Sequence, residues 1–294
     1  MTHAFCSRLA ETTHGVIAGT GVRGDIYVFL PVKKRWWGAS EFNAGWATPT
    51  DIEALKRARR AGVVTRLYDP KVERGAEVLV HRSPSAPSSA SAALSELLAG
   101  IAHHDWGIED RQTPRLALCT QGTRDRCCAK WGFPVYRAAQ ALYEAGRLAL
   151  APIECSHLGG DRFAATGILF PSGSMYGHLD KVDLATLAAL DAQGGILHAN
   201  YRGRVFENPI VQIVRAGLAR AGEPVTPTSP LAVLNPQDAP GSLEVIASDR
   251  RYEVLLARRE VQFFADCRSV NRDRLSKEGR LVCEAVRALG PAER

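Results

Sequence analysis

Short apolar runs alternate with amphipathic segments along the first 82 residues of the chain. Residues 26–32 form a continuous run rich in β-branched and aromatic side chains, which predicts a buried strand. Good helix formers with apolar residues three to four positions apart predict a helix from Thr50 and Asp51 to Gly62. Residues 63–68 and 77–81 predict two further strands. This order is typical of a small α/β unit.

A second series of strands and helices is predicted after residue 110. Here the runs of apolar residues are again short, and turn residues separate them. The predicted elements are a strand at 115–118, a helix at 134–150, a strand at 149–154, a hairpin at 167–170 and 174–179, helices at 183–192 and 208–221, two or three antiparallel strands within 243–265, and a final helix at 273–289.

One low-complexity stretch indicates how the chain is divided. Residues 83–93 consist of Ser, Pro and Ala, a composition typical of a mobile loop or linker. We therefore expect an N-terminal α/β region at 1–110, a central domain at 111–205 and a C-terminal extension, one helix and a β-rich part, at 206–294.

The composition is that of an ordinary globular protein. The 294 residues are 46% apolar and 23% charged, and no apolar run approaches the roughly 20 residues that a membrane-spanning helix needs. The N-terminus lacks the pattern of a signal peptide, so we expect a cytoplasmic protein. Seven cysteines in such a chain favour metal binding or redox chemistry over a disulfide framework. The net charge of +6 comes from scattered basic residues, which does not indicate a nucleic-acid partner.

Two segments carry the candidate chemistry. The first holds Cys119 and Cys128 on one glycine-containing loop, and the second holds His157 and Asp161 with two glycines between them. Paired cysteines and a short i, i+4 ligand pair are what a 2Fe–2S cluster requires. Glycine allows a loop to bend tightly around an inorganic core, because it has no Cβ and tolerates positive φ.

These residues give the chain a family resemblance. It resembles the sucrase/ferredoxin-like family over about residues 6 to 270, and its central part is similar to thioredoxin-like 2Fe–2S ferredoxins. The resemblance implies an α/β fold with a thioredoxin-like ferredoxin domain, a bound 2Fe–2S cluster and a redox partner such as a flavoprotein or a ferredoxin reductase. The shared motifs are Cys6-Ser7, residues 119–129, residues 156–164 and Tyr201-Arg202-Gly203-Arg204.

The resemblance implies four cluster ligands, and two of them have alternatives. Cys128 is favoured over Cys127 because the ferredoxin-like pattern has Ala next and Gly four positions after the ligand, as at Gly132. Fungal members of the family use two Cys and two His, and Asp161 stands where the second His would be. The fourth ligand is thus Asp161 or, alternatively, a thiolate from Cys155. The expected ligands are Cys119, Cys128, His157 and Asp161.

Single-electron transfer is the function that this cluster implies. The protein would act as an oxidoreductase component, within a reductase or as a redox sensor in iron metabolism. The first alternative is a zinc-stabilised interaction protein using the same Cys and His residues. The second, taken from the family's label, is a sucrose-cleaving hydrolase, which needs two carboxylates at a fixed separation, and no convincing pair is present.

Two further groups of residues carry expectations: charged residues beside the ligands, and cysteines far from them in sequence. Charged side chains beside the ligands are expected to stabilise a reduced cluster or dock a partner, or simply to pair with one another. Three further cysteines lie far from the motifs in sequence and are expected to be buried or incidental thiols. The charged residues are Arg124, Asp125, Arg126 and Arg162, and the cysteines are Cys6, Cys267 and Cys283.

Overall fold

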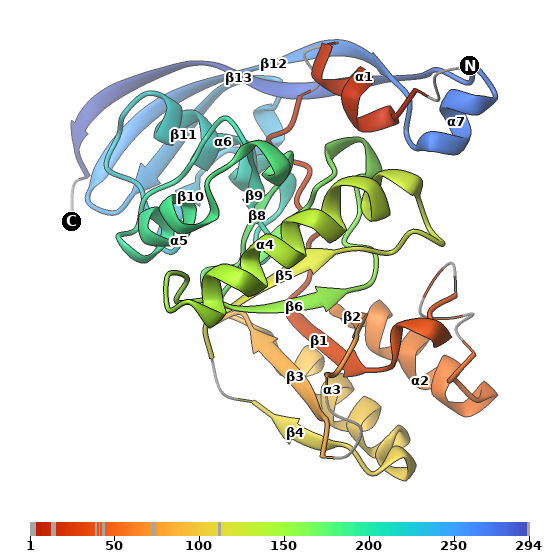
Figure 1. The fold of residues 1–294 in the computed structure, drawn as a ribbon. Helices are drawn as coiled ribbons and strands as arrows, with labels where there is room; N and C mark the ends of the chain where they lie inside the picture. The colour runs from red at the N-terminus through yellow and green to blue at the C-terminus, as the bar shows by residue number, and fades with distance from the viewer. Residues whose placement is uncertain are drawn as a thin grey trace.

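Two β-sheets organise the protein (Figure 1). The computed structural model describes residues 4–12, 16–38, 40, 42, 45–71, 75–110 and 113–292. The larger sheet has nine strands in the order β4-β3-β1-β2-β6-β5-β7-β8-β9, and the smaller one has four in the order β10-β11-β12-β13. Parallel and antiparallel pairs both occur in the large sheet, so the α/β class predicted from the sequence is confirmed.

The N-terminal half of the large sheet follows the predicted order closely. Parallel strands β1 and β2 are joined by α2, which begins with a capping box between Thr48 and Asp51, and β3 is antiparallel to β1. Helices α2 and α3 cover an apolar core that includes Leu55 and Leu94. The elements are β1 (Ile26–Pro31), α2 (Pro49–Arg60), β2 (Val63–Tyr68), β3 (Glu77–Arg82), α3 (Ser88–Gly100) and β4 (Gly107–Glu109).

The stretch predicted to be a linker is partly helical. Helix α3 starts at Ser88, inside the Ser-, Pro- and Ala-rich residues 83–93. Its buried residues Ala90, Leu94 and Leu97 recur every three to four positions, so burial of one face stabilises the helix. Composition suggested a loop, and tertiary packing overrode that weak preference.

The second half of the sheet has the arrangement expected of a thioredoxin-like unit. Strands β5 and β6 are parallel and connected by α4, and β7 and β8 add in antiparallel orientation on the other side of β5. Helix α4 ends at Glu144 rather than near 150, because Gly146 takes a left-handed conformation (φ 68°). The elements are β5 (Arg115–Cys119), α4 (Phe133–Glu144), β6 (Ala151–Cys155), β7 (Gly167–Phe170), β8 (Ser174–Tyr176), α5 (Leu184–Ala192) and β9 (Tyr201–Arg204).

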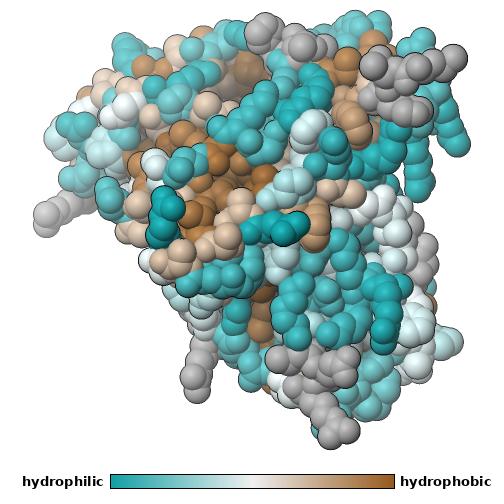
Figure 2. Space-filling model, in the orientation of Figure 1, coloured by the Kyte–Doolittle hydropathy of each residue, from teal (hydrophilic) through white to brown (hydrophobic). Residues whose placement is uncertain are grey.

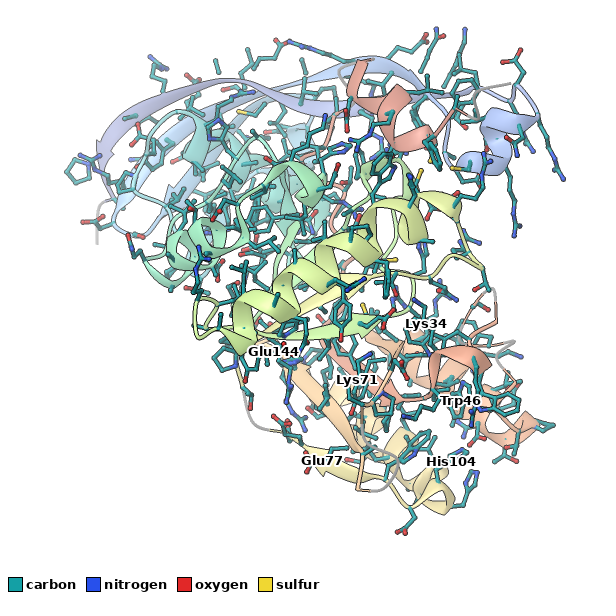
Figure 3. The ribbon with its side chains drawn as sticks, in the orientation of Figure 1. Lys34, Trp46, Lys71, Glu77, His104 and Glu144 are labelled. Carbon is teal, nitrogen blue, oxygen red and sulfur yellow. The ribbon has the colours of Figure 1, made fainter. Side chains whose placement is uncertain are left out.

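The two halves meet edge to edge. Strand β2 pairs with β6 through Tyr68 and Cys155. Beside this contact the buried Glu154 forms ion pairs with Lys34 and Lys71, which lie between the halves in Figure 3. Burial opposes ionisation of Glu154, but the Lys34 and Thr120 hydrogen bonds lower its pKa. The sheet is therefore continuous, and the division into domains near 110 and 205 stays a prediction.

The C-terminal region is a long antiparallel sheet packed on α6. The predicted final helix at 273–289 is wrong, because these residues form β13, which pairs with β12 from Phe263–Ser276 to Arg250–Pro291. These residues include good helix formers, but as a strand they supply the backbone hydrogen bonds that β12 would otherwise lack, and this outweighs their helix propensity. The elements are α6 (Pro209–Arg220), β10 (Leu231–Val233), β11 (Gly241–Ala247), β12 (Arg250–Phe263), α7 (Cys267–Asn271) and β13 (Ser276–Pro291).

Short helices from opposite ends of the chain lie side by side. Helix α1 (Cys6–Thr12) contacts α7 beyond the end of the β12–β13 hairpin (Figure 1). On the face shown in Figure 2, apolar side chains gather beside α5 and above α4, while the N-terminal half is mostly hydrophilic. None of the helices in the described residues combines the length and the apolar character that crossing a bilayer requires.

Candidate metal centre

The two candidate loops leave the sheet at the same edge. Cys119 is the last residue of β5 and pairs in register with Cys155, the last residue of the parallel strand β6. Loops at the carboxyl ends of neighbouring parallel strands face the same crevice, where α/β proteins commonly bind ligands. Cys119 and Cys155 are both buried, so the site starts from a rigid, water-excluded floor.

A π-helical turn brings Cys128 back to Cys119. It spans Cys128–Gly132 and leads directly into α4. A Cβ atom on Gly132 would lie 2.0 Å from the carbonyl oxygen of Cys119, so only glycine permits this approach. Single π-turns inside helices are frequent at functional sites, and this one sets the separation of the two predicted thiolate ligands.

The second loop is bent by two glycines and held from outside by an arginine. Gly159 and Gly160 have φ values of 87° and 74° and place Asp161 at the start of a short 3₁₀ turn. The buried Arg202 donates a hydrogen bond of 2.7 Å to the carbonyl oxygen of Gly159. On the other side, the His157 N–H donates to the Gln121 side chain at 2.7 Å. Arg202, in the Tyr-Arg-Gly-Arg element, thus positions the loop from outside the ligand set.

Three of the four expected ligands converge here, and Asp161 lies against two of them. One ligand atom each from Cys119, Cys128 and His157 lies within 4.8 Å of the others. Asp161 Oδ1 lies 3.2 Å from His157 Nδ1 and 3.5 Å from Cys128 Sγ. Asp161 and both cysteines are buried, whereas the His157 side chain keeps 21% of its surface exposed. Neither Asp161 nor the buried Cys155 belongs to the group of three, so the choice between them as fourth ligand stays a prediction.

The donor atoms of this cluster of residues suit a metal cation. The hydrogen bond with Cys128 lowers the pKa of the Cys119 thiol, and the same bond together with burial raises the pKa of Cys128. Burial also raises the pKa of Asp161. His157 Nδ1 is buried and makes no hydrogen bond within the described residues, although Asp161 is close. Two thiols, an orphaned imidazole nitrogen and a carboxyl group therefore form a donor set that iron or zinc would satisfy.

The neighbouring Cys127 points away from this group. Successive residues in a helical turn project about 100° apart, so the two adjacent thiols cannot share a site. Cys127 Sγ instead lies 3.5 Å from Cys6 Sγ and 3.3 Å from Cys267 Sγ. Cys6, Cys267 and Cys283 are all buried, as expected of buried or incidental thiols. Cys6 and Cys267 in addition converge with Cys127, whereas Cys283 packs against Gly217. The sequence drew attention to the Cys127-Cys128 dipeptide and to Cys6-Ser7, but neither indicated that these thiols meet Cys267.

Arginines surround the exposed side of the candidate site. A cavity of about 390 Å³ reaches His157 and is lined by Arg23, Arg59, Arg66 and Arg124. Arg162 is instead buried, with its guanidinium 3.7 Å from the centre of the Phe263 ring. The predicted basic surroundings are therefore divided between a solvent-facing pocket and a buried position.

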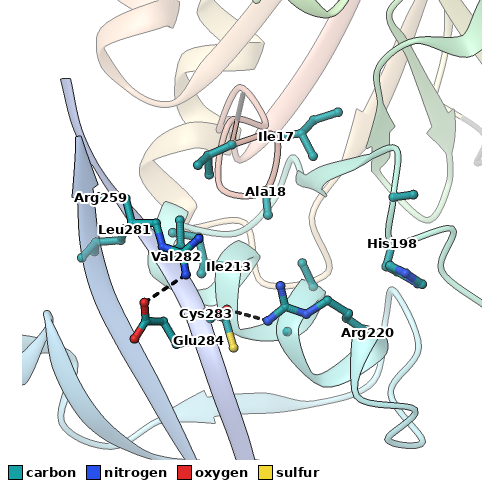
Figure 4. A pocket seen from close by; sticks show the side chains of 14 residues that line it. Ile17, Ala18, His198, Ile213, Arg220, Arg259, Leu281, Val282, Cys283 and Glu284 are labelled. Carbon is teal, nitrogen blue, oxygen red and sulfur yellow. Dashed lines mark hydrogen bonds and ion pairs between the residues drawn. The ribbon is translucent and has the colours of Figure 1, made fainter. Parts of the chain in front are cut away.

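A second cavity lies apart from the ligand loops. It has a volume of about 520 Å³ and lies between α6 and β13 (Figure 4). Arg220 donates to the carbonyl oxygen of Cys283 in its wall, and Arg259 pairs with Glu284 at 3.1 Å. None of the four expected ligands is among its fourteen lining residues, so it does not extend the candidate centre.

Fold and site together define a mixed α/β protein with a candidate metal centre at the edge of its sheet. The model of the Sucrase/ferredoxin-like family matches residues 25–203, which is more than half of the chain. The protein therefore belongs to this family, as the motifs in the sequence suggested. No curated protein and no solved structure matches the chain.

Proposed function

We propose that the protein binds a 2Fe–2S cluster and transfers single electrons. The observation that carries this proposal is the convergence of two buried thiols with His157, whose Nδ1 lies 3.2 Å from Asp161 Oδ1. When bound, the cluster would accept and release one electron at a time. Cys119, Cys128, His157 and Asp161 would hold the cluster.

The surrounding residues would set the properties of this centre. Imidazole is neutral and a weaker electron donor than thiolate, so His157 would raise the reduction potential relative to a four-cysteine centre. The buried walls exclude water, and the Gln121 and Arg202 hydrogen bonds fix the His157 loop from both sides. A rigid ligand loop keeps the geometry of both oxidation states similar.

His157 also marks the side on which a partner would dock. It is the most exposed of the four proposed ligands, and it opens into the pocket lined by arginines. Arginines on this face would attract an acidic partner and speed its approach. A flavoprotein or a ferredoxin reductase with an acidic docking face fits this description.

Metal and sulfide analysis tests the proposal. Protein purified from iron-replete cells should be reddish brown, with about two iron and two acid-labile sulfide per chain. Cys283→Ser replaces a buried thiol that is in neither group of converging cysteines and should leave both values unchanged. Colourless wild-type protein without sulfide would refute the proposal.

A zinc-stabilised interaction protein is the second candidate, favoured by one observation. The ligand atoms of Cys119, Cys128 and His157 lie within 4.8 Å of one another, a spacing that a single tetrahedral ion can also accept. The same preparation separates the two candidates, because zinc bound by these residues would be lost in Cys119→Ser and would bring no sulfide.

A further inference from the structure

Three thiols from distant parts of the chain form a compact triangle. The Sγ atoms of Cys6, Cys127 and Cys267 are separated by 3.5, 3.3 and 3.7 Å. All three residues are buried and occur as free cysteines. They come from α1, the turn before Cys128 and α7, so they are up to 261 positions apart in the sequence.

The triangle has the size that one tetrahedral ion requires. In a tetrahedral site with metal–sulfur bonds of about 2.3 Å, the ligand sulfurs lie about 3.8 Å apart. Each of the three Sγ–Sγ distances differs from this value by no more than about 0.5 Å. An ion at that distance from all three sulfurs would lie about 1.1 Å out of their plane. Cysteines bound to separate irons of a cluster stand further apart, because the inorganic core lies between them.

A buried carboxylate completes and orients the group. Asp125 accepts hydrogen bonds from the backbone N–H of Cys127 at 2.8 Å and of Cys267 at 2.7 Å, one on each oxygen. A carboxylate oxygen of Asp125 also lies within 4.8 Å of each of the three sulfurs. Ser7 donates a hydrogen bond of 3.3 Å to Cys127 Sγ, as hydroxyl groups do to metal-bound thiolates.

We propose that a single structural zinc ion is held at a second site by four buried residues: Cys6, Asp125, Cys127 and Cys267. Zinc suits this set because it has no geometric preference of its own and accepts three thiolates and one carboxylate in a closed tetrahedral site. The ion would tie α1 and α7 to the loop that carries Cys128. Each member of the Cys127-Cys128 pair then serves a different metal, which fixes the direction of Cys128.

The environment of the site supports a structural role. Phe5, Trp131, Phe264 and Val270 pack around the cysteines and exclude solvent. Three thiolates and one carboxylate around Zn²⁺ leave a net charge of −2. The buried guanidinium of Arg162 interacts electrostatically with Cys6 and offsets part of that charge.

Zinc content measured separately from iron tests the site in the full-length protein. We expect one zinc per chain in the wild type and in Cys283→Ser, and a loss to near zero in Cys6→Ser and Cys267→Ser. Cys119→Ser should keep the zinc and lose the iron, which separates this site from the proposed cluster. Zinc that disappears in Cys119→Ser but persists in Cys267→Ser would overturn the assignment, as would wild-type protein without zinc or with a disulfide among the three cysteines.

Two measurements keep the test valid if the serine variants fold poorly. X-ray absorption at the zinc edge of the wild type should give three sulfurs at about 2.3 Å and one oxygen at about 2.0–2.2 Å. Cys267→His should retain one zinc with two sulfurs and one nitrogen, since imidazole is an equally good zinc ligand. A wild-type spectrum with fewer than three sulfurs, or a histidine variant without zinc, would refute the proposal.

Discussion

Replacing Gly132 by alanine should remove the candidate cluster through a single added methyl group. Gly132 has helical backbone angles (φ −72°, ψ −40°), so alanine needs no change of conformation. Its Cβ would nevertheless lie 2.0 Å from the Cys119 carbonyl oxygen, against an ordinary minimum of about 3.0 Å. The strand end and the turn must therefore separate by about 1 Å, whereas metal–ligand distances tolerate about 0.2 Å.

The same contact determines the effect on stability. Alanine gains about 0.8–1.0 kcal/mol of helix propensity over glycine. Overpacking costs about 1–3 kcal/mol, and the upper end applies because the obstacle is the backbone of a central strand. We expect a net loss of about 1–2 kcal/mol in the free energy of unfolding.

Iron, sulfide and urea-induced unfolding should be measured for this variant and for a matched control. Gly100, the last residue of α3, lies far from the ligand loops in sequence. Gly100→Ala places its Cβ 3.1 Å from the Ala54 side chain of α2 and should keep full iron content. Gly132→Ala with wild-type iron, sulfide and unfolding free energy would show that the contact does not control the ligand separation.

Three further predictions concern the ligands and pH. Cys128→Ser should abolish the visible absorbance of the cluster, whereas Cys127→Ser should retain at least part of it. The reverse result would make Cys127 the ligand in place of Cys128. Asp161→His should raise the reduction potential by removing one negative charge, and Asp161→Ala should deplete the cluster; an unchanged spectrum and potential in Asp161→Ala would exclude it as a ligand. Burial lowers the pKa of His81 to about 4, below its usual 6.5, so the unfolded chain binds more protons between these values. The free energy of unfolding should therefore fall by up to about 3 kcal/mol as the pH drops from 6.5 to 4. The His81 ring is stacked on Phe170, so His81→Phe should fit the same space and lose this pH dependence. An equal dependence in both proteins would show that His81 is not its source.

The strands and helices around the candidate site could largely be predicted from the sequence. The strand at 26–31 carries a continuous apolar signal, and helix α2 has a capping residue and a glycine at its ends. The loops with Cys119 and His157 were recognisable because glycines and ligand residues occur together. Such signals are local, and local patterns report the elements that they build.

Tertiary structure alone decided the features that depend on distant partners. Residues 276–291 contain good helix formers, yet they pair with β12 because the backbone of that strand requires a neighbour. Residues 88–93 are low in complexity, yet burial of Leu94 and Leu97 makes the segment helical. The convergence of Cys6 and Cys267 with Cys127 gave no signal in the sequence, because it depends on how the two ends of the chain pack together. The sequence by itself determined the ligand types and their loops, whereas folding determined which thiols face which site.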